Sequence, residues 1–148
     1  MDATGFIFAP APQFSAHVFL TLEGGLLAGS PLGQQPIPAA NFTQLLAVRQ
    51  WLQAAFASTT LADFGIYRAL KGEAADYVLL AEHLDFPERT FRIILSLNQD
   101  LNLAGLDAVS ALNSPALESS LNQPGLMLDY LDLRFDPKIF YKFKPLLP

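Results

Sequence analysis

Residues 125–144 predict a β-hairpin, and the rest of the chain is best understood around it. Two strand-like runs, 126–135 and 138–144, are separated only by Asp136 and Pro137. Proline suits the second position of a tight turn, and aspartate is favoured just before it. The second run alternates as a half-buried strand does: Ile139, Tyr141 and Phe143 share one face, and Lys138, Phe140, Lys142 and Lys144 share the other.

The second arm of this hairpin is a candidate binding strand, because no later strand of the chain follows to cover its free side. If it lies at a sheet edge, its unpaired backbone N–H and C=O groups can pair with a strand of another chain. Lysines on such a strand are also a common guard against uncontrolled edge-to-edge pairing, and that alone would explain them. Phe140 and Tyr141 must face opposite ways, and the pattern does not decide which one faces the core.

Length and composition predict one soluble domain with a sizeable core. A chain of 148 residues buries about 70% of the surface that it exposes when unfolded. It is 51% hydrophobic and only 16% charged, which hints at buried partner surface. No apolar run approaches the ~20 residues of a transmembrane helix, and no signal peptide is apparent at the start. The lack of cysteine excludes disulfides and thiol catalysis, and it is compatible with an oxidising extracytoplasmic space.

The charge of the chain is acidic overall and basic at one end. The formal net charge of −5 argues against nucleic-acid binding, since no positive field is available to displace counterions from phosphate. Three of the nine basic residues and none of the 14 acidic ones lie in 138–148, so the first 137 residues carry −8. This asymmetry favours a partner strand with acidic flanks.

The remaining patterns predict an α+β fold. Residues 1–22 read as a first hairpin, 23–40 as a long glycine- and proline-rich loop, and 41–58 as a helix capped by Asn41. Strands are expected within 60–70, 76–81 and 90–97, followed by a second helical stretch opened by Gln99 and Asp100. We expect a mostly antiparallel twisted sheet with two main helices packed on one face and the C-terminal hairpin at a sheet edge.

No group of residues amounts to an active site or a metal site, and no cofactor is expected. His83 lies near Glu82 and Asp85, but a zinc site needs three or four ligands, so a solvated loop is the simpler interpretation. The glycines of 24–33 lack the Lys-Ser/Thr of a P-loop and the spacing of a nucleophile elbow. Asp129 and Asp132 are three apart on a strand, so they are expected on opposite faces. Asp132 and Arg134 share a face, where a cross-strand ion pair with a neighbouring residue is expected.

Two motifs resemble the FtsQ/DivIB family of bacterial cell-division proteins. The run Tyr130-Leu-Asp-Leu-Arg-Phe135, followed by a turn and a final strand, is similar to the C-terminal hairpin of that family. The start, Asp2-Ala-Thr-Gly5-Phe-Ile-Phe8, is similar to the D-x-x-G-x-x-F opening of the second extracytoplasmic domain of the family, the β domain. The order of loop, helix, three strands, helix and hairpin also fits, so the resemblance spans nearly the whole chain. We therefore expect 1–148 to be one β domain, without the transmembrane helix and POTRA domain of the full-length proteins.

The resemblance implies a non-enzymatic scaffold of the divisome, on the extracytoplasmic side of the membrane at the division septum. Such proteins recruit an FtsB–FtsL coiled-coil pair, and the last strands of the β domain receive a strand of FtsB by β-augmentation. Membrane attachment would come only through an upstream helix. Pro137 departs from the small or polar turn residues of other members. By position, the implied partner-binding residues are Tyr130, Phe135, Lys138, Ile139, Phe140, Tyr141, Lys142 and Phe143.

Three other interpretations remain open. A small-molecule binding module would hold an apolar pocket beneath the 23–40 loop. A small hydrolase would need a convergent set of catalytic residues that the sequence does not show, with His17 or His83 as its first candidates. A homodimer could form through the same open strand edge.

Overall fold

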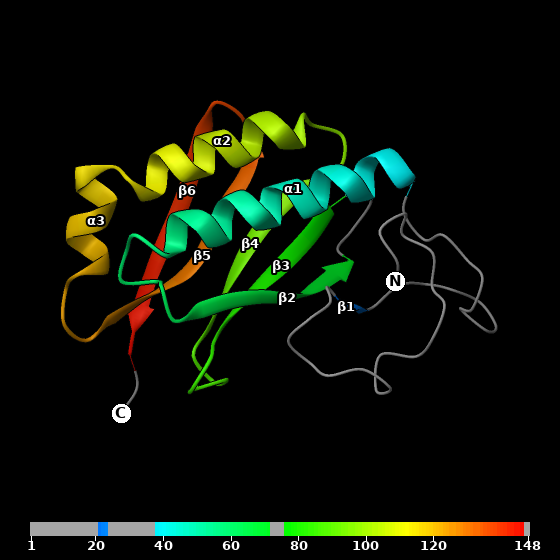
Figure 1. Cartoon of the computed structure of the whole chain (residues 1–148). Coiled ribbons are helices and arrows are strands. Elements are labelled where there is room, and N and C mark those ends of the chain that lie inside the picture. The colour runs from blue at the N-terminus through cyan, green and yellow to red at the C-terminus, as the bar shows by residue number, and fades with distance from the viewer. Residues whose placement is uncertain (1–20, 24–37, 72–75, 147–148) are drawn as a thin grey trace.

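The computed structural model describes residues 21–23, 38–71 and 76–146. It has an α+β fold in which helices cover one face of a mixed sheet (Figure 1). Most of the expected first hairpin and of the 23–40 loop therefore lies outside the described residues. The described part at their junction is a short strand, β1 (Thr21–Glu23).

Three helices are present in the described part of the chain. The first, α1 (Ala39–Phe56), begins two residues before Asn41, so the predicted Asn41 cap is wrong. Pro38 is extended at φ −53° and ψ 139°, and its carbonyl accepts the first helical hydrogen bond from the Phe42 N–H at 3.0 Å. A proline carbonyl can begin the helix in this way because only the proline N–H is missing.

The second helix, α2 (Leu101–Leu112), begins where the sequence predicts. Asp100 is its N-cap, and the Asp100 carboxylate accepts from the backbone N–H groups of Asn102 and Leu103 at 2.9 and 3.2 Å. The short helix α3 (Pro115–Leu121) follows, with Ser114 as its cap and proline in its first turn.

The sheet runs in the order of the sequence, from β1 to β6. The longer strands are β2 (Phe64–Lys71), β3 (Asp76–His83), β4 (Thr90–Ser96), β5 (Leu126–Phe135) and β6 (Lys138–Pro145). Three of the neighbouring pairs are antiparallel, as expected, but β1 with β2 and β4 with β5 are parallel.

The two parallel pairs explain why the helices lie on one face of the sheet. Parallel neighbours need a crossover, and α1 forms the one between β1 and β2, while α2 and α3 form the one between β4 and β5. Both crossovers step in the same direction across the sheet between strands of the same orientation. Crossover connections between parallel strands are almost always right-handed. Two such connections with the same direction therefore place α1 and α2 on the same face, as Figure 1 shows.

One hydrophobic core fills the space between the helices and the sheet. Leu45, Val48 and Leu52 of α1 are fully buried, opposite Ile93 of β4 and Leu131 of β5. The two helices approach closely at Gly105 of α2, where an added Cβ would lie 2.5 Å from the Trp51 ring. Trp51 of α1 is partly buried there and packs against the edge of the core.

Candidate functional site

The C-terminal hairpin forms one edge of the described sheet. β5 and β6 pair antiparallel, with Leu131 opposite Tyr141, and the turn between them contains Asp136 and a cis peptide bond to Pro137. β6 is the last strand in the sheet order, and no described residue pairs with its outer side (Figure 1). The edge position predicted for this strand is confirmed.

The two faces of β6 alternate as the sequence predicts. Ile139 and Phe143 pack against the core on the helix side of the sheet. Tyr141 is opposite the buried Leu131 and so shares that face, although 43% of it stays exposed at the margin. Phe140 is opposite Asp132 on the other face. The strand register therefore decides which of the two residues faces the core: Tyr141 lies on the helix side, and Phe140 lies on the opposite face.

An exposed aromatic pair lies next to the hairpin turn. The rings of Phe135 and Phe140 meet edge to face with centroids 5.5 Å apart, and they are 53% and 50% exposed. The Arg134 guanidinium lies 5.5 Å from the Phe135 ring centroid. Tyr130 is farther inside, partly buried on β5, with Arg92 5.9 Å from its ring centroid. Tyr130 is thus a neighbour of the edge and not part of it.

The lysines of β6 differ in their surroundings. Lys144 reaches back over the sheet, where its Nζ donates to the Thr90 carbonyl at 3.1 Å and lies 3.6 Å from the Asp129 carboxylate. Lys138 and Lys142 are exposed and have no ion pair with any described residue. Two cations of this strand therefore remain available to an acidic partner.

The predicted cross-strand ion pair is present between Arg134 and Asp76, and Asp132 joins it from the same strand as Arg134. Arg134 is 2.7 Å from the carboxylates of both Asp132 and Asp76, so the cluster spans from β5 to β3. The hydrogen bonds that Arg134 donates to Asp132, and to a lesser degree the one to Asp76, raise the pKa of Arg134 above its usual value. Asp132 is only 6% exposed. The cluster ties the hairpin to the sheet.

The prediction that Asp129 and Asp132 lie on opposite faces is wrong. A bulge between Leu128 and Tyr130 adds one residue to β5, which changes the alternation. Asp129 then lies 3.6 Å from both Arg92 and Lys144, on the face away from the helices. The two carboxylates still bind different cations, so they do not form a paired acid and base.

His83 has a more ordered environment than the solvated loop expected for it. It ends β3, and its ring lies between those of Phe64 and Phe86, at 5.1 and 5.0 Å between centroids. Glu82 is held by Arg68 at 2.7 Å. In the described ranges, no three histidine, aspartate or glutamate side chains gather as a metal site would require. His17 and the glycines of 24–33 lie outside those ranges.

A cavity of about 170 Å³ lies at the end of the hairpin farthest from its turn. Sequence reasoning missed it, because its walls come from segments far apart in the chain. The only local signal is Arg89, a cation three residues after Phe86 in a short loop. The pocket expected beneath the 23–40 loop falls largely outside the described residues.

Comparison with known proteins adds no family assignment, since neither a protein-family model nor a curated protein sequence matches the chain. Within the described part of the chain, no helix is both long enough and apolar enough to cross a membrane.

Proposed function

We propose that this domain is a non-enzymatic adaptor that binds a partner protein by adding one strand of the partner to the outer edge of β6. The observation that carries the proposal is that β6 is the last strand in the order of the described sheet. A free strand edge offers backbone hydrogen bonds in register, and flanking side chains supply the selectivity.

The side chains around the edge favour an apolar strand with acidic residues. Phe135 and Phe140 offer a half-exposed aromatic anchor on one face, and Tyr141 offers a second ring on the other. Lys138 and Lys142 supply two cations in an otherwise acidic chain. Five or six backbone hydrogen bonds at ~0.5–1.5 kcal/mol each, with an aromatic anchor of ~2 kcal/mol, correspond to a Kd on the order of 1 μM after the cost of association.

We propose further that the adaptor is a divisome scaffold domain of the FtsQ/DivIB kind, acting outside the bacterial membrane at the septum. The order of helix, three strands, helices and terminal hairpin in the structure is the order that the sequence resemblance implies. The partners would be FtsB-like and FtsL-like proteins, and the strand would come from the FtsB-like chain. Membrane anchoring of every component would raise the effective concentration, so micromolar affinity is sufficient.

Calorimetric titration tests this function. The titrant is the extracytoplasmic C-terminal segment of the FtsB-like protein from the same genome. Separate proline variants at Ile139, Phe140, Tyr141 and Lys142 each remove one backbone N–H. Consecutive residues of a strand direct their N–H groups to opposite sides. One alternate pair should therefore destabilise the β5–β6 pairing, and the other pair should leave the domain folded and abolish binding.

The result that contradicts strand addition is full binding by all folded proline variants. Absence of binding by the wild-type domain would contradict the assignment to a divisome scaffold. Sedimentation of the domain alone provides the control, because a homodimer formed through the same edge would be lost in the same alternate variants.

A further inference from the structure

The cavity at the end of the hairpin farthest from its turn is lined by both apolar and polar groups. Leu61 and Leu128 are its buried walls, and Phe64, Leu121, Leu126 and Met127 continue them toward the surface. A cavity of about 150 Å³ lined by leucine, isoleucine and phenylalanine stays dry and binds benzene. The volume of about 170 Å³ therefore suits an apolar group of about six carbon atoms.

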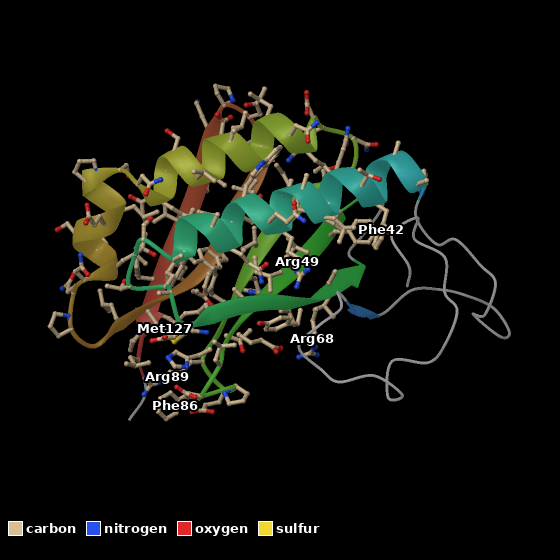
Figure 2. All side chains as sticks on the ribbon, in the orientation of Figure 1. Phe42, Arg49, Arg68, Phe86, Arg89 and Met127 are labelled. Atoms are coloured by element: carbon tan, nitrogen blue, oxygen red, sulfur yellow. The ribbon has the colours of Figure 1, made fainter. Side chains whose placement is uncertain are left out.

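Two hydrogen-bond donors line the same cavity. Arg89 stacks on Phe86, with its guanidinium carbon 4.4 Å from the ring centroid, and it has no ion pair with any described carboxylate. The Nδ1 atom of His83 accepts from the Asp85 N–H at 3.1 Å, which leaves Nε2 as the ring nitrogen that can donate. Figure 2 shows Arg89, Phe86 and Met127 at this end of the sheet.

A chain of ring contacts links these donors to the core. The Phe86 and His83 rings are in contact, His83 contacts Phe64, and Phe64 lies 5.3 Å from the buried Phe91. The β3–β4 loop is also held by hydrogen bonds from the His83 N–H to the Arg89 carbonyl at 3.0 Å and from the Leu84 N–H to the Asp63 carbonyl at 2.8 Å. The donors are thus preorganised, which lowers the entropy cost of binding a ligand.

We infer that this cavity binds a small carboxylate with an apolar body of about six carbon atoms. The body fills the apolar walls, and the carboxylate accepts hydrogen bonds from Arg89 and His83. Because Arg89 has no ion pair with a described carboxylate, its guanidinium favours an anion in the cavity, and a charge-assisted bond to a carboxylate is about twice as strong as a neutral one. The site does not depend on the proposed strand addition, since no residue of β6 lines it.

Methyl NMR titration tests the inference, with benzoate as the probe and benzyl alcohol as its neutral counterpart. The expected result is a saturable shift of the Leu126 and Met127 methyl signals by benzoate, with a Kd on the order of 1 mM. Benzyl alcohol should bind about tenfold more weakly. Arg89→Gln should weaken benzoate about tenfold and leave benzyl alcohol unchanged.

Arg92→Gln is the matched control, because it removes the same charge from an exposed site outside the cavity and should change neither affinity. Leu126→Phe should weaken both probes by filling the cavity. Equal affinity for the two probes, or unchanged benzoate binding in Arg89→Gln, would overturn the carboxylate assignment. The absence of a saturable shift at tens of millimolar would overturn the site itself.

Discussion

The rings of Phe135 and Phe140 meet edge to face across the terminal turn, with centroids 5.5 Å apart, and about half of each ring is exposed. Large aromatic surfaces left open beside a free strand edge are typical of binding anchors. Phe135 lies on β5 and Phe140 on β6, so the relative position of the two rings depends on the register that the turn sets.

Replacement of Phe140 by alanine should weaken partner binding by about 2 kcal/mol, because one ring of this exposed anchor is removed. The free energy of unfolding should fall by less than about 1 kcal/mol, since the ring is half exposed. Calorimetric titration and chemical denaturation measure the two effects. Phe143→Ala is the comparison, because Phe143 packs against the core and its loss should act mainly on stability. Unchanged binding by Phe140→Ala would exclude Phe140 from the interface.

Replacement of Gly105 by alanine should destabilise the domain by about 1–3 kcal/mol, although alanine favours a helix by ~1 kcal/mol over glycine. The added Cβ would lie 2.5 Å from the Trp51 ring, so the ring or α2 must move. Thermal denaturation measures the loss, and Trp51→Leu in the same background should recover part of it. Ser110→Ala, on the exposed side of α2, controls for helix propensity. An alanine variant more stable than the wild type would show that Trp51 moves freely.

The Asp107 carboxyl of α2 makes stability depend on pH. A hydrogen bond with Asp136 of the hairpin turn, together with burial and the charge of Asp136, raises the pKa of Asp107 above its usual 3.8. The folded state therefore binds this proton more tightly than the unfolded state does. The stabilisation from the protonated Asp107 carboxyl is fully present below pH 3.8, and it is lost as the pH rises through the pKa that Asp107 has in the folded state.

The Asp107→Asn variant should accordingly be slightly more stable than the wild type at pH 7, by about 0.5 kcal/mol or less, because the pair is partly exposed. The difference should vanish near pH 3, where the wild-type carboxyl is protonated. Melting curves between pH 3 and pH 7 test this, with Asp85→Asn on an exposed loop as the charge-matched control. A difference independent of pH would contradict the proposed coupling.

Removal of Arg134 should destabilise the domain by about 1–3 kcal/mol at neutral pH. The change Arg134→Gln leaves the nearly buried Asp132 carboxylate without its cation, and the loss is moderated because Arg134 and Asp76 are partly exposed. Adding Asp132→Asn should recover part of the stability. A double-mutant cycle measured by urea denaturation gives the coupling free energy between Arg134 and Asp132. Additive effects of the two changes would show that the ion pair contributes no specific stability.

Local patterns predicted much of this protein correctly. The alternation of β6, its short turn after β5 and the Asp100 cap all follow from neighbouring residues, because strand period, turn chemistry and helix capping act over only a few positions. The α+β class followed from the order of these elements. The prediction of an Asn41 cap failed because the helix is capped by Pro38, three residues earlier, and capping patterns fix helix starts only loosely.

Tertiary structure alone decided how distant segments meet. The parallel pairing of β4 with β5 depends on the crossover through α2 and α3, and the contact of Arg134 with Asp76 joins residues 58 positions apart. The bulge at Asp129 redirected a carboxylate that strict alternation placed on the other face. The cavity beside Arg89 exists only where several chain segments converge. A sequence sets periodicity and local preference directly, whereas register, crossover and convergence are set by the packing of the whole core.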